Sequence, residues 1–458
     1  MKRSVLTFAA LASGAGLMAQ PAFAAVPDAE VVSGGTAYIL NTLLFLIGGF
    51  LVMWMAAGFA MLEAGLVRAK NTSTQCLKNI GLYSIAGLMF WVIGYNIAYP
   101  GFAEDSLGLI GGFTGIYSMQ EVGAADTETG YSVASDWFFQ MVFCATTASI
   151  VSGTIAERVK IVPFFIFVTV LTGVIYPVVV SWEWGGGYLD SVHGFSDFAG
   201  STLVHSTGGW AALMGAIIIG ARLGRYGPDG KVNVFPGTNI PLATLGTFIL
   251  WLGWFGFNGA SQLAMGTVGD VSDVSKIFVN TNMAAAGGVV TAIILTQVLY
   301  KKADVTMALN GALAGLVSIT AEPLAPSVGA SIVIGGIGGA IVVFTVPLLD
   351  KFKIDDVVGA IPVHLFAGIW GTLVVAYSTQ TTFNEGEANE YTNSVLEQLG
   401  AQAVGVALTA VWVCAASAIV WLALKYTIGV RPSEEDEIGG LDHAEIGVEA
   451  YPEFARGT

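Results

Sequence analysis

Charged residues are scarce in this sequence. Asp, Glu, Lys and Arg together make up 11% of its 458 residues, against about 25% in a typical soluble domain. So small a share argues against a soluble globular enzyme and against a disordered protein. Positive charge is the scarcer sign, because 18 Lys and Arg residues stand against 33 Asp and Glu residues, for a net charge of −15. A nucleic-acid-binding protein, which needs a basic face, does not fit this balance.

Cysteine is nearly absent. The three cysteines, Cys76, Cys144 and Cys414, form no CxxC pair. Neither a disulfide framework nor a cysteine-based zinc site is therefore expected. We interpret all three as packing residues.

Apolar residues and glycine are abundant instead. Hydrophobic residues make up 54% of the chain, 59 residues are glycine, and the mean hydropathy is +0.71. This composition indicates an all-α polytopic membrane protein. The chain opens with a basic Met1–Arg3 segment, an apolar run and a small-residue A-x-A pattern ending at Ala24. That order is typical of a secretory signal, so we expect residues 1–24 to be a signal peptide of a bacterial envelope protein.

Eleven apolar windows follow, each near the roughly 20 residues that a bilayer requires. They contain no internal Asp, Glu, Lys or Arg, except Asp304 at a border. We expect the domain of eleven transmembrane helices to occupy residues 25–424, followed by a tail over residues 425–458. The windows are 37–62, 79–100, 137–156, 161–182, 200–221, 240–260, 277–300, 304–321, 327–349, 357–379 and 400–424.

The distribution of positive charge predicts the orientation. Without Lys2 and Arg3 of the signal, 16 of the 18 Lys and Arg residues remain. If the mature N-terminus lies outside, 15 of these fall on inner segments and only Lys276 falls outside. This split obeys the positive-inside rule. The sequence therefore predicts eleven spans, an outer N-terminus and a cytoplasmic C-terminus.

Two of the windows share a pattern. Val204–His205 is followed by two glycines and Trp210, and Val363–His364 is followed by Gly368 and Trp370. They are the fifth and tenth windows, so they cross in opposite directions. We therefore expect two five-helix inverted repeats, at about 37–221 and 240–379, plus an extra helix at about 400–424. Inverted repeats of this kind place a binding site near the midplane.

His205 and His364 are the only histidines inside the windows. An ionisable group within a membrane is costly and is a functional hypothesis by default. Three interpretations remain open from the residues alone: a pore for a small polar solute, a bis-histidine haem site or a metal site. The metal site is disfavoured because no Cys, Asp or Glu lies at matching depth, and no metal or cofactor is expected.

Aromatic residues cluster near the same depth. Phe139 and Phe143 lie four residues apart on one helix face, and Trp254 and Phe257 share another face with Trp251. Such stripes are often packing or belt residues. The alternative is a cation site, because aromatic faces attract ammonium-type ions.

Three polar or interfacial residues lie close to these stripes. Trp184 follows the fourth window, and Ser261 adds a hydrogen-bonding group beyond the sixth. Asp197 precedes the fifth window, where a carboxylate can cap the helix. Direct binding of a cation by Asp197 is the alternative.

The sequence resembles the bacterial ammonium transporters of the Amt/Mep/Rh superfamily. The likeness covers nearly the whole mature chain. It rests on 65–71 (GLVRAKN), 156–158 (AER), 184–187 (WGGG), 197–201 (DFAGS), 204–205 (VH) and 253–258 (GWFGFN).

The resemblance implies a homotrimeric transporter, not an enzyme, with one conduction path in each subunit and no cofactor. By it, His205 and His364 are the twin-histidine pair of the pore. Phe143 and Phe257 are the stacked pair that blocks the outer entrance. Ammonium, with methylammonium as its analogue, would be the substrate.

The resemblance also implies an outer recruitment site and its surroundings. Trp184, Phe143 and Ser261 would gather ammonium, and Asp197 would be the buried aspartate beside them. Further vestibule or pore residues would be Phe139, Trp254 and Thr320.

The family also suggests a cellular setting. It implies the bacterial inner membrane and a cytoplasmic PII-type regulatory protein that meets the tail. This chain reads Ile446–Gly447–Val448 where many members have His-Gly-Glu, so the resemblance does not define how the tail couples to that protein.

The expected mechanism follows from the cost of moving a bare ion. Dehydrating a small cation costs on the order of 20 kcal/mol in an idealised apolar medium, whereas a desolvated cation–π contact returns about 2 kcal/mol. Ammonium is therefore expected to lose its proton, with ammonia and the proton passing the histidines, since imidazoles relay protons. A passive ammonia channel and an ammonium-sensing receptor are the alternatives.

Overall fold

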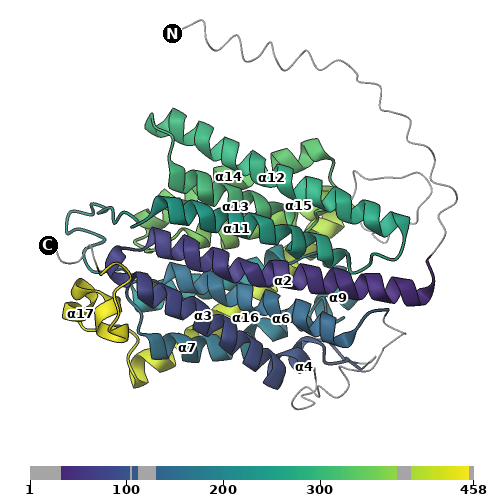
Figure 1. Ribbon diagram of the computed structural model, residues 1–458, viewed down its shortest axis with the longest axis horizontal. Helices are drawn as coiled ribbons and strands as arrows, with labels where there is room; N and C mark the ends of the chain where they lie inside the picture. The colour runs from purple at the N-terminus through teal and green to yellow at the C-terminus, as the bar shows by residue number, and fades with distance from the viewer. Residues whose placement is uncertain (1–31, 104–105, 112–129, 379–393, 453–458) are drawn as a thin grey trace, which may run out of the picture.

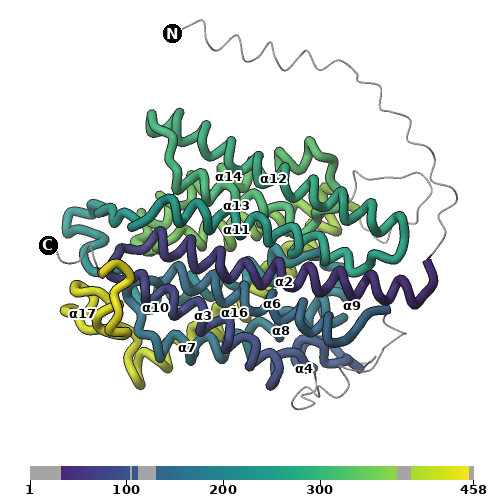
Figure 2. The backbone as a smooth tube through the Cα atoms, in the orientation of Figure 1, coloured from purple at the N-terminus to yellow at the C-terminus, as the bar shows by residue number. Residues whose placement is uncertain are grey.

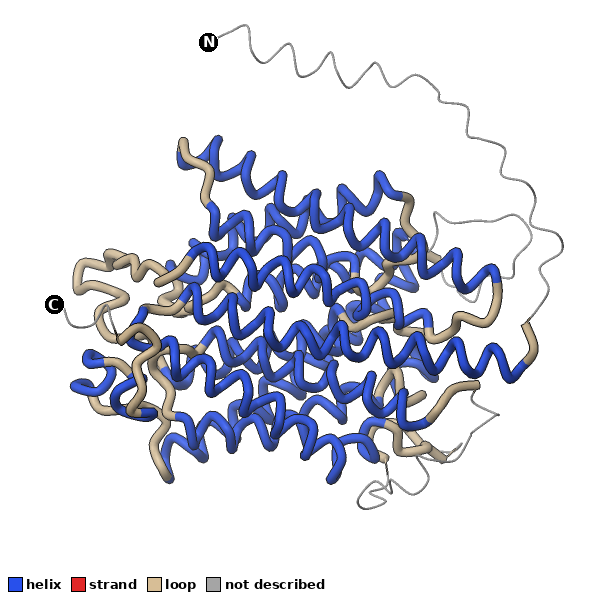
Figure 3. Tube along the Cα trace, viewed as in Figure 1, coloured by secondary structure: helices blue, strands red, loops and turns tan. Residues whose placement is uncertain are grey.

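The computed structural model describes residues 32–103, 106–111, 130–378 and 394–452. The expected signal peptide, residues 1–24, lies outside this range. Within the described chain, all regular structure is helical except for one isolated bridge between Tyr226 and Val232, as Figure 3 shows.

Each of the eleven apolar windows lies on a helix. Nine helical segments of the described chain are long and apolar enough to cross a membrane, judged by length and composition, and α13 is a shorter apolar helix. Several segments are continuous helices that contain one π-helical turn. The main elements are α2 (Gly34–Leu66), α3 (Thr72–Met89) with η2 (Phe90–Gly94) and α4 (Tyr95–Ala98), α6 (Val133–Thr154), α7 (Ile161–Val170) with η3 (Leu171–Ile175) and α8 (Tyr176–Ser181), α9 (Tyr188–His193), η4 (Ser201–Ser206) with α10 (Thr207–Ile219), α11 (Ile240–Gly259), α12 (Val268–Tyr300), α13 (Val305–Ile319), α14 (Val328–Lys351), η6 (Ile361–Phe366) with α15 (Ala367–Ser378) and α16 (Val395–Thr427).

The helices form one bundle with their axes in roughly the same direction (Figures 1 and 2). α2 packs along α11, and α12 packs against α13 and α14. Glycine permits these close approaches. A Cβ on Gly246 of α11 would lie 2.3 Å from the backbone N of Leu62 on α2, and one on Gly288 of α12 would lie 2.0 Å from the carbonyl O of Gly311 on α13. Small residues at helix contacts are typical of membrane bundles.

Several helices, among them α2, α3 and α6, extend beyond their expected windows and thereby include charged residues. α2 continues to Leu66 and contains Glu63, α3 begins at Thr72 and contains Lys78, and α6 begins at Val133 and contains Asp136. Glu63 and Lys78 are each 1% exposed. The helices are longer than the hydropathy windows, because each of these windows ends where a charged residue appears.

After α16 the chain folds back onto one end of the bundle, which we call the tail end (Figure 1). The tail includes α17 (Glu434–Gly439) and η7 (Asp442–Ile446). Asp442 accepts hydrogen bonds from the backbone N of Ser73 (2.9 Å) and of Thr74 (2.7 Å) at the start of α3. A carboxylate at a helix N-terminus is favoured by the exposed N–H groups and the helix dipole. The tail is thus fixed to the bundle by α3.

Candidate functional site

The two histidines lie together at the centre of the bundle. His205 is on η4 and His364 is on η6, and both side chains are buried. Their Nδ1 atoms are 3.2 Å apart, and their rings are stacked with centroids 5.2 Å apart. A hydrogen bond between two Nδ1 atoms needs one proton, so one ring donates and the other accepts. π-helical turns frequently mark functional sites, and each histidine lies on one.

The local sequence that positions the histidines is repeated. Asp197 and Gly200 precede His205 by eight and five residues, and Asp356 and Gly359 precede His364 by the same intervals. Both glycines have positive φ, 109° and 81°, a conformation that residues with a Cβ rarely adopt. An Asp-x-x-Gly segment therefore precedes each histidine, which the Val-His comparison did not reveal.

Each of these aspartates binds the first backbone N–H groups of its histidine helix. Asp197 accepts from four of them, at 2.7–2.9 Å. Asp356 accepts from Gly359 N at 3.1 Å and Ile361 N at 2.7 Å. Burial raises the pKa of Asp197 to about 6, although its four backbone donors act in the opposite direction. With its oxygens engaged in this way, Asp197 acts as a helix cap.

An aromatic column leads away from the histidine pair. Trp254 and Phe257 stack on His205, with ring centroids 4.9 Å and 5.2 Å from it. Phe143 lies 4.1 Å from Phe257, and Trp184 lies edge-on to Phe143 at 5.9 Å. The column therefore connects Trp184 to the histidines without a gap between rings.

One polar atom at the base of this column has no partner. Nε2 of His205 is buried and, among the described residues, makes no hydrogen bond. One ring carbon, Cε1, separates it from the Nδ1 that faces His364. A buried unsatisfied nitrogen is costly, so this position is suited to a small molecule that donates or accepts one hydrogen bond.

A cavity of about 450 Å³ lies at the other end of the column, away from the tail end. The expected residues Phe139, Phe143, Trp184 and Ser261 line it. The hydroxyl of Ser261 donates to the carbonyl O of Phe257 (2.8 Å), which leaves its oxygen lone pairs available. We call this cavity the vestibule.

The sequence comparison missed several polar residues of the vestibule. Asp136 lines it beside Phe139, and its Oδ2 accepts from the hydroxyl of Tyr95 at 2.7 Å. Asp136 was overlooked because the third apolar window begins at residue 137. Its position three residues before Phe139, on the same helix face, was the available signal. The further lining residues are Tyr95, Tyr99, Tyr131, Gln140, Phe198 and Leu263.

A comparison with known proteins decides the family. The sequence profile of the Ammonium Transporter Family matches residues 43–451. This chain belongs to the ammonium transporter family. It is 39% identical over 427 residues to ammonium transporter Amt2 of Archaeoglobus fulgidus, covering 89% of this chain and 87% of the relative. It is 37% identical over 447 residues to ammonium transporter Amt1 of Haloferax mediterranei, covering 93% and 81%.

Solved structures of the same family share the fold. A protein described as "Sensor Amt Protein" aligns with a TM-score of 0.82 and 35% identity, over 90% of this chain and 99% of that one. Mep2 of Candida albicans aligns with a TM-score of 0.78 and 26% identity, over 92% of each chain. The all-helical membrane bundle of this ammonium transporter family member is therefore the family fold.

The remaining residues suggested by the sequence lie next to the column. Trp254 Nε1 donates to Oγ1 of Thr320 at 2.8 Å, which fixes the indole against His205. Phe139 packs on Phe143 at 4.7 Å. Trp251, one turn before Trp254 on α11, stacks on the exposed Phe248 at 6.2 Å.

Trp184 is tied to the cap of the first histidine helix. Its Nε1 donates to the carbonyl O of Asp197 at 2.9 Å, and the Asp197 backbone N donates to Oε1 of Glu183 at 3.1 Å. Burial raises the pKa of Glu183 well above its usual value, with the neighbouring Asp197 acting in the same direction. The vestibule wall and the helix that carries His205 are therefore one hydrogen-bonded unit.

A buried ion network fixes the tail end. Arg222 binds Asp355 through two bonds of 2.8 Å and lies 3.4 Å from Glu157. Glu157 also binds Arg68 at 2.5 Å and has a positive φ of 69°. These contacts explain the 65–71 and 156–158 motifs as structural connections between helix ends.

No cluster of three or more His, Cys, Asp and Glu side chains able to hold a metal ion occurs among the described residues.

Proposed function

We propose that this protein takes up ammonium across the membrane through the aromatic column and the histidine pair. The unpartnered Nε2 of His205 beneath Phe257 is the observation that carries the proposal. It offers a hydrogen-bonding position to a molecule that has passed Phe143 and Phe257. Ammonia is small enough for such a position and both donates and accepts hydrogen bonds.

Recruitment occurs in the vestibule. The rings of Phe143 and Trp184 attract ammonium by cation–π contact, and the oxygen of Ser261 accepts one of its hydrogen bonds. Asp136 adds a carboxylate that the column itself lacks. Its negative charge raises the local concentration of cations.

Ammonium gives up a proton below the vestibule. The N–H bond that breaks leaves ammonia, and the proton passes to the histidine pair, since the shared Nδ1 proton makes the rings a relay. Ammonia follows the same path past Trp254 and Phe257. Net charge crosses the membrane because the proton and ammonia are both delivered. In the passive alternative only ammonia crosses.

A sensing role is the second candidate. The similar structure described as "Sensor Amt Protein" favours it, because the same fold there belongs to a sensor. A receptor would bind ammonium in the vestibule with little flux. Measured transport separates the two.

The proposed architecture has eleven spans. The nine long apolar segments, the shorter α13 and the 22-residue α6 support this count. We place the N-terminus in the periplasm and the tail end in the cytoplasm of a bacterial inner membrane, with residues 1–24 as the signal peptide. A homotrimer with one path per subunit is the assembly that the family resemblance supports.

A PII-type protein is the proposed cytoplasmic partner. The docked tail lies at the end of the bundle where such a protein would close the path. Gly447 has a positive φ of 74° and ends η7 between Ile446 and Val448. Pull-down with the host PII protein in each nucleotide state tests the contact, and absence of binding in all of them removes this partner.

The decisive experiment is electrical. Purified protein in liposomes on a solid support receives an ammonium pulse. A saturable current supports coupled uptake. Ammonia flux without current supports the passive channel, and binding without either supports the receptor.

A further inference from the structure

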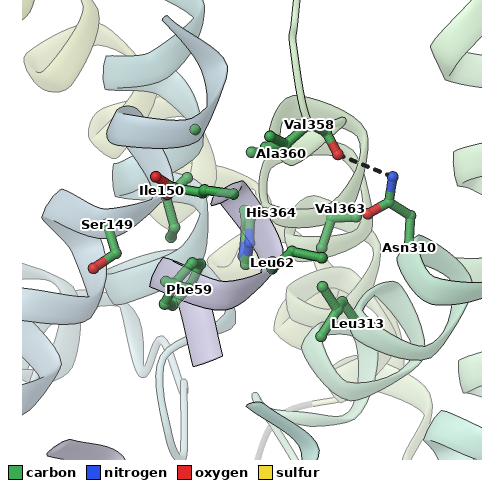
Figure 4. A pocket seen from close by; sticks show the side chains of 12 residues that line it. Phe59, Leu62, Ser149, Ile150, Asn310, Leu313, Val358, Ala360, Val363 and His364 are labelled. Atoms are coloured by element: carbon green, nitrogen blue, oxygen red, sulfur yellow. Dashed lines mark hydrogen bonds between the residues drawn. The ribbon is translucent and has the colours of Figure 1, made fainter. Parts of the chain in front are cut away.

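A second, much smaller cavity lies on the opposite side of His364 from the vestibule. Its lining comes from α2, α6, α13 and the chain around η6, and Figure 4 shows His364 at its centre between Phe59 and Val363. The space open to the centre of a water-sized molecule is about 10 Å³. That is room for a single molecule of this size. We call it the inner cavity.

One lining residue, Glu63, has a carboxylate oxygen that accepts no hydrogen bond within the described part of the chain. Oε1 of Glu63 is buried and accepts no hydrogen bond from the described residues. Two other polar lining residues are engaged. Asn310 donates to the carbonyl O of Val358 at 3.1 Å (Figure 4), and Ser149 donates to the carbonyl O of Ala145 at 3.2 Å.

The second oxygen of Glu63 is fully occupied. Oε2 accepts from Asn79 Nδ2 at 2.8 Å, from Ser152 Oγ at 2.9 Å and from Gln75 Nε2. All three donors approach the same oxygen, so they fix the plane of the carboxylate. Oε1 is held in place without being bound.

The positive charge that balances Glu63 lies behind these donors. Lys78 Nζ donates to Gln75 Oε1 at 3.1 Å and to the carbonyl O of Ser152 at 2.8 Å, so it reaches the carboxylate through the residues that hold Oε2. These donors and the Lys78 charge favour the carboxylate form, which burial opposes. The cavity side of the carboxylate therefore keeps an acceptor for one further cationic or N–H group.

A glycine keeps the space beside this oxygen open. A Cβ on Gly153 of α6 would lie 3.3 Å from Oε1 of Glu63 and 2.5 Å from Cγ2 of Val358. Any larger residue at 153 would enter the gap between these two atoms. The inner cavity thus depends on a residue without a side chain.

We propose that the inner cavity is a cargo site in which ammonium re-forms against Glu63. The inference rests on the proposed function. Ammonia that has passed the histidines enters the cavity and takes the relayed proton. The N–H bond of the protonated His364 ring breaks, the nitrogen lone pair of ammonia forms the new N–H bond, and His364 returns to its neutral form. Glu63 Oε1 accepts a hydrogen bond from the new ammonium.

The test compares two variants that differ only in this carboxylate. Lys78→Met removes the buried positive charge and retains Glu63, and Glu63→Gln/Lys78→Met removes both charges. In liposomes, the maximal ammonium current of the double variant should be about tenfold below that of Lys78→Met, since loss of one hydrogen bond to a charged group has effects of this order. The half-saturating ammonium concentration should not change, because recruitment occurs in the vestibule. Equal maximal currents in the two variants would overturn the inference.

A third variant covers the case in which changes at Lys78 prevent folding. Gly153→Ala leaves every charge in place and puts a methyl group beside Oε1. It should lower the maximal current, whereas Gly87→Ala on α3, whose Cβ would make only ordinary contact with Met141 at 3.7 Å, should not. A Gly153→Ala current equal to that of Gly87→Ala would count against the inner site.

The same measurements distinguish a failure of the inner cargo site from a failure of the proposed transport through the histidine pair. His205→Ala/His364→Ala is measured in parallel. If that variant keeps its full current, the proposed function fails. If it loses the current while Glu63→Gln/Lys78→Met matches Lys78→Met, only the inner cargo site fails.

Discussion

His205 and His364 face each other through the same ring atom, Nδ1, at 3.2 Å. The contact joins the two halves of the chain, because each histidine lies on its own π-helical turn after its own capping aspartate. One ring donates its Nδ1 proton and the accepting ring carries its own proton on Nε2, so both rings are neutral at rest. A charged imidazole would be costly in these apolar surroundings, and the symmetric contact avoids that cost.

The first prediction concerns this pair. His205→Ala/His364→Ala removes the relay and leaves a wider space for solute. We expect the ammonium-coupled current to fall to the level of empty liposomes while the protein still assembles. Current and trimer yield are measured together. A full-sized ammonium-dependent current that still excludes other cations would mean that the histidines are structural.

Much of the fold is predictable from the sequence because membrane helices depend on local composition. Each apolar window lies on a helix, and the matched Val-His pairs identified two buried histidines that the structure places in contact. The stacking of Phe143 on Phe257 came from family resemblance and not from periodicity. Periodicity placed Trp251 beside Trp254, and the structure adds that Trp251 stacks on Phe248.

The missed residues are those whose burial depends on distant partners. Glu63 is stabilised by hydrogen-bond donors from α3 and α6. The local sequence of α2 does not predict these contacts. Hydropathy windows end at such a charge, because an isolated charge in a membrane is costly. Asp136 was excluded from the third apolar window for the same reason. A search for Asp-x-x-Gly before each histidine would have found Asp356, since that repeat is visible in the sequence.

The second prediction concerns recruitment. Trp184→Leu removes a ring from the vestibule and the hydrogen bond to Asp197. The half-saturating concentration for ammonium or methylammonium should rise about fivefold, in line with a cation–π contact of about 1 kcal/mol. Trp412→Leu is the control, because the Trp412 indole also donates to a carbonyl, that of Ile175, outside the vestibule. An unchanged concentration dependence for Trp184→Leu would favour simple anchoring.

The third prediction concerns Asp136. Asp136→Asn retains the shape of the side chain and removes its charge from the vestibule. The half-saturating concentration should rise a few-fold, and the effect should shrink at high salt because counterions screen the attraction. Asp190→Asn, at an exposed carboxylate on α9, provides the comparison. Equal behaviour of the two variants would leave Asp136 with a structural role only.

The fourth prediction concerns orientation. A reporter that is active only in the cytoplasm is fused after Thr458 or inserted into the 380–399 connection. We expect activity from the first fusion and none from the second, because the positive residues gather on the segments that share a side with the tail. The reverse pattern would reject the eleven-span arrangement.

The fifth prediction concerns the ion network at the tail end. Burial would raise the pKa of Asp355, but the hydrogen bonds and charge of Arg222, with the charge of Arg158, outweigh it and hold that pKa well below its usual 3.8. A carboxyl whose pKa is lower in the folded state stabilises the fold above its unfolded pKa and loses that contribution as pH falls through the folded value. The stabilisation by Asp355 is therefore complete at neutral pH and declines below about pH 4.

The variant Asp355→Asn should mimic the low-pH state at every pH. Removing one partner of a buried pair destabilises a protein by about 3 kcal/mol, and here it leaves Arg222 with Glu157, at 3.4 Å, as its remaining acidic partner. Thermal unfolding in detergent measures the difference at pH 7, where it should be large, and again near pH 3, where it should shrink. Asp229→Asn, on an exposed loop of the same end, should change neither value. A difference between wild type and Asp355→Asn that stays constant from pH 7 to pH 3 would contradict the ionised Arg222–Asp355 pair, because only the charged carboxylate distinguishes the two proteins.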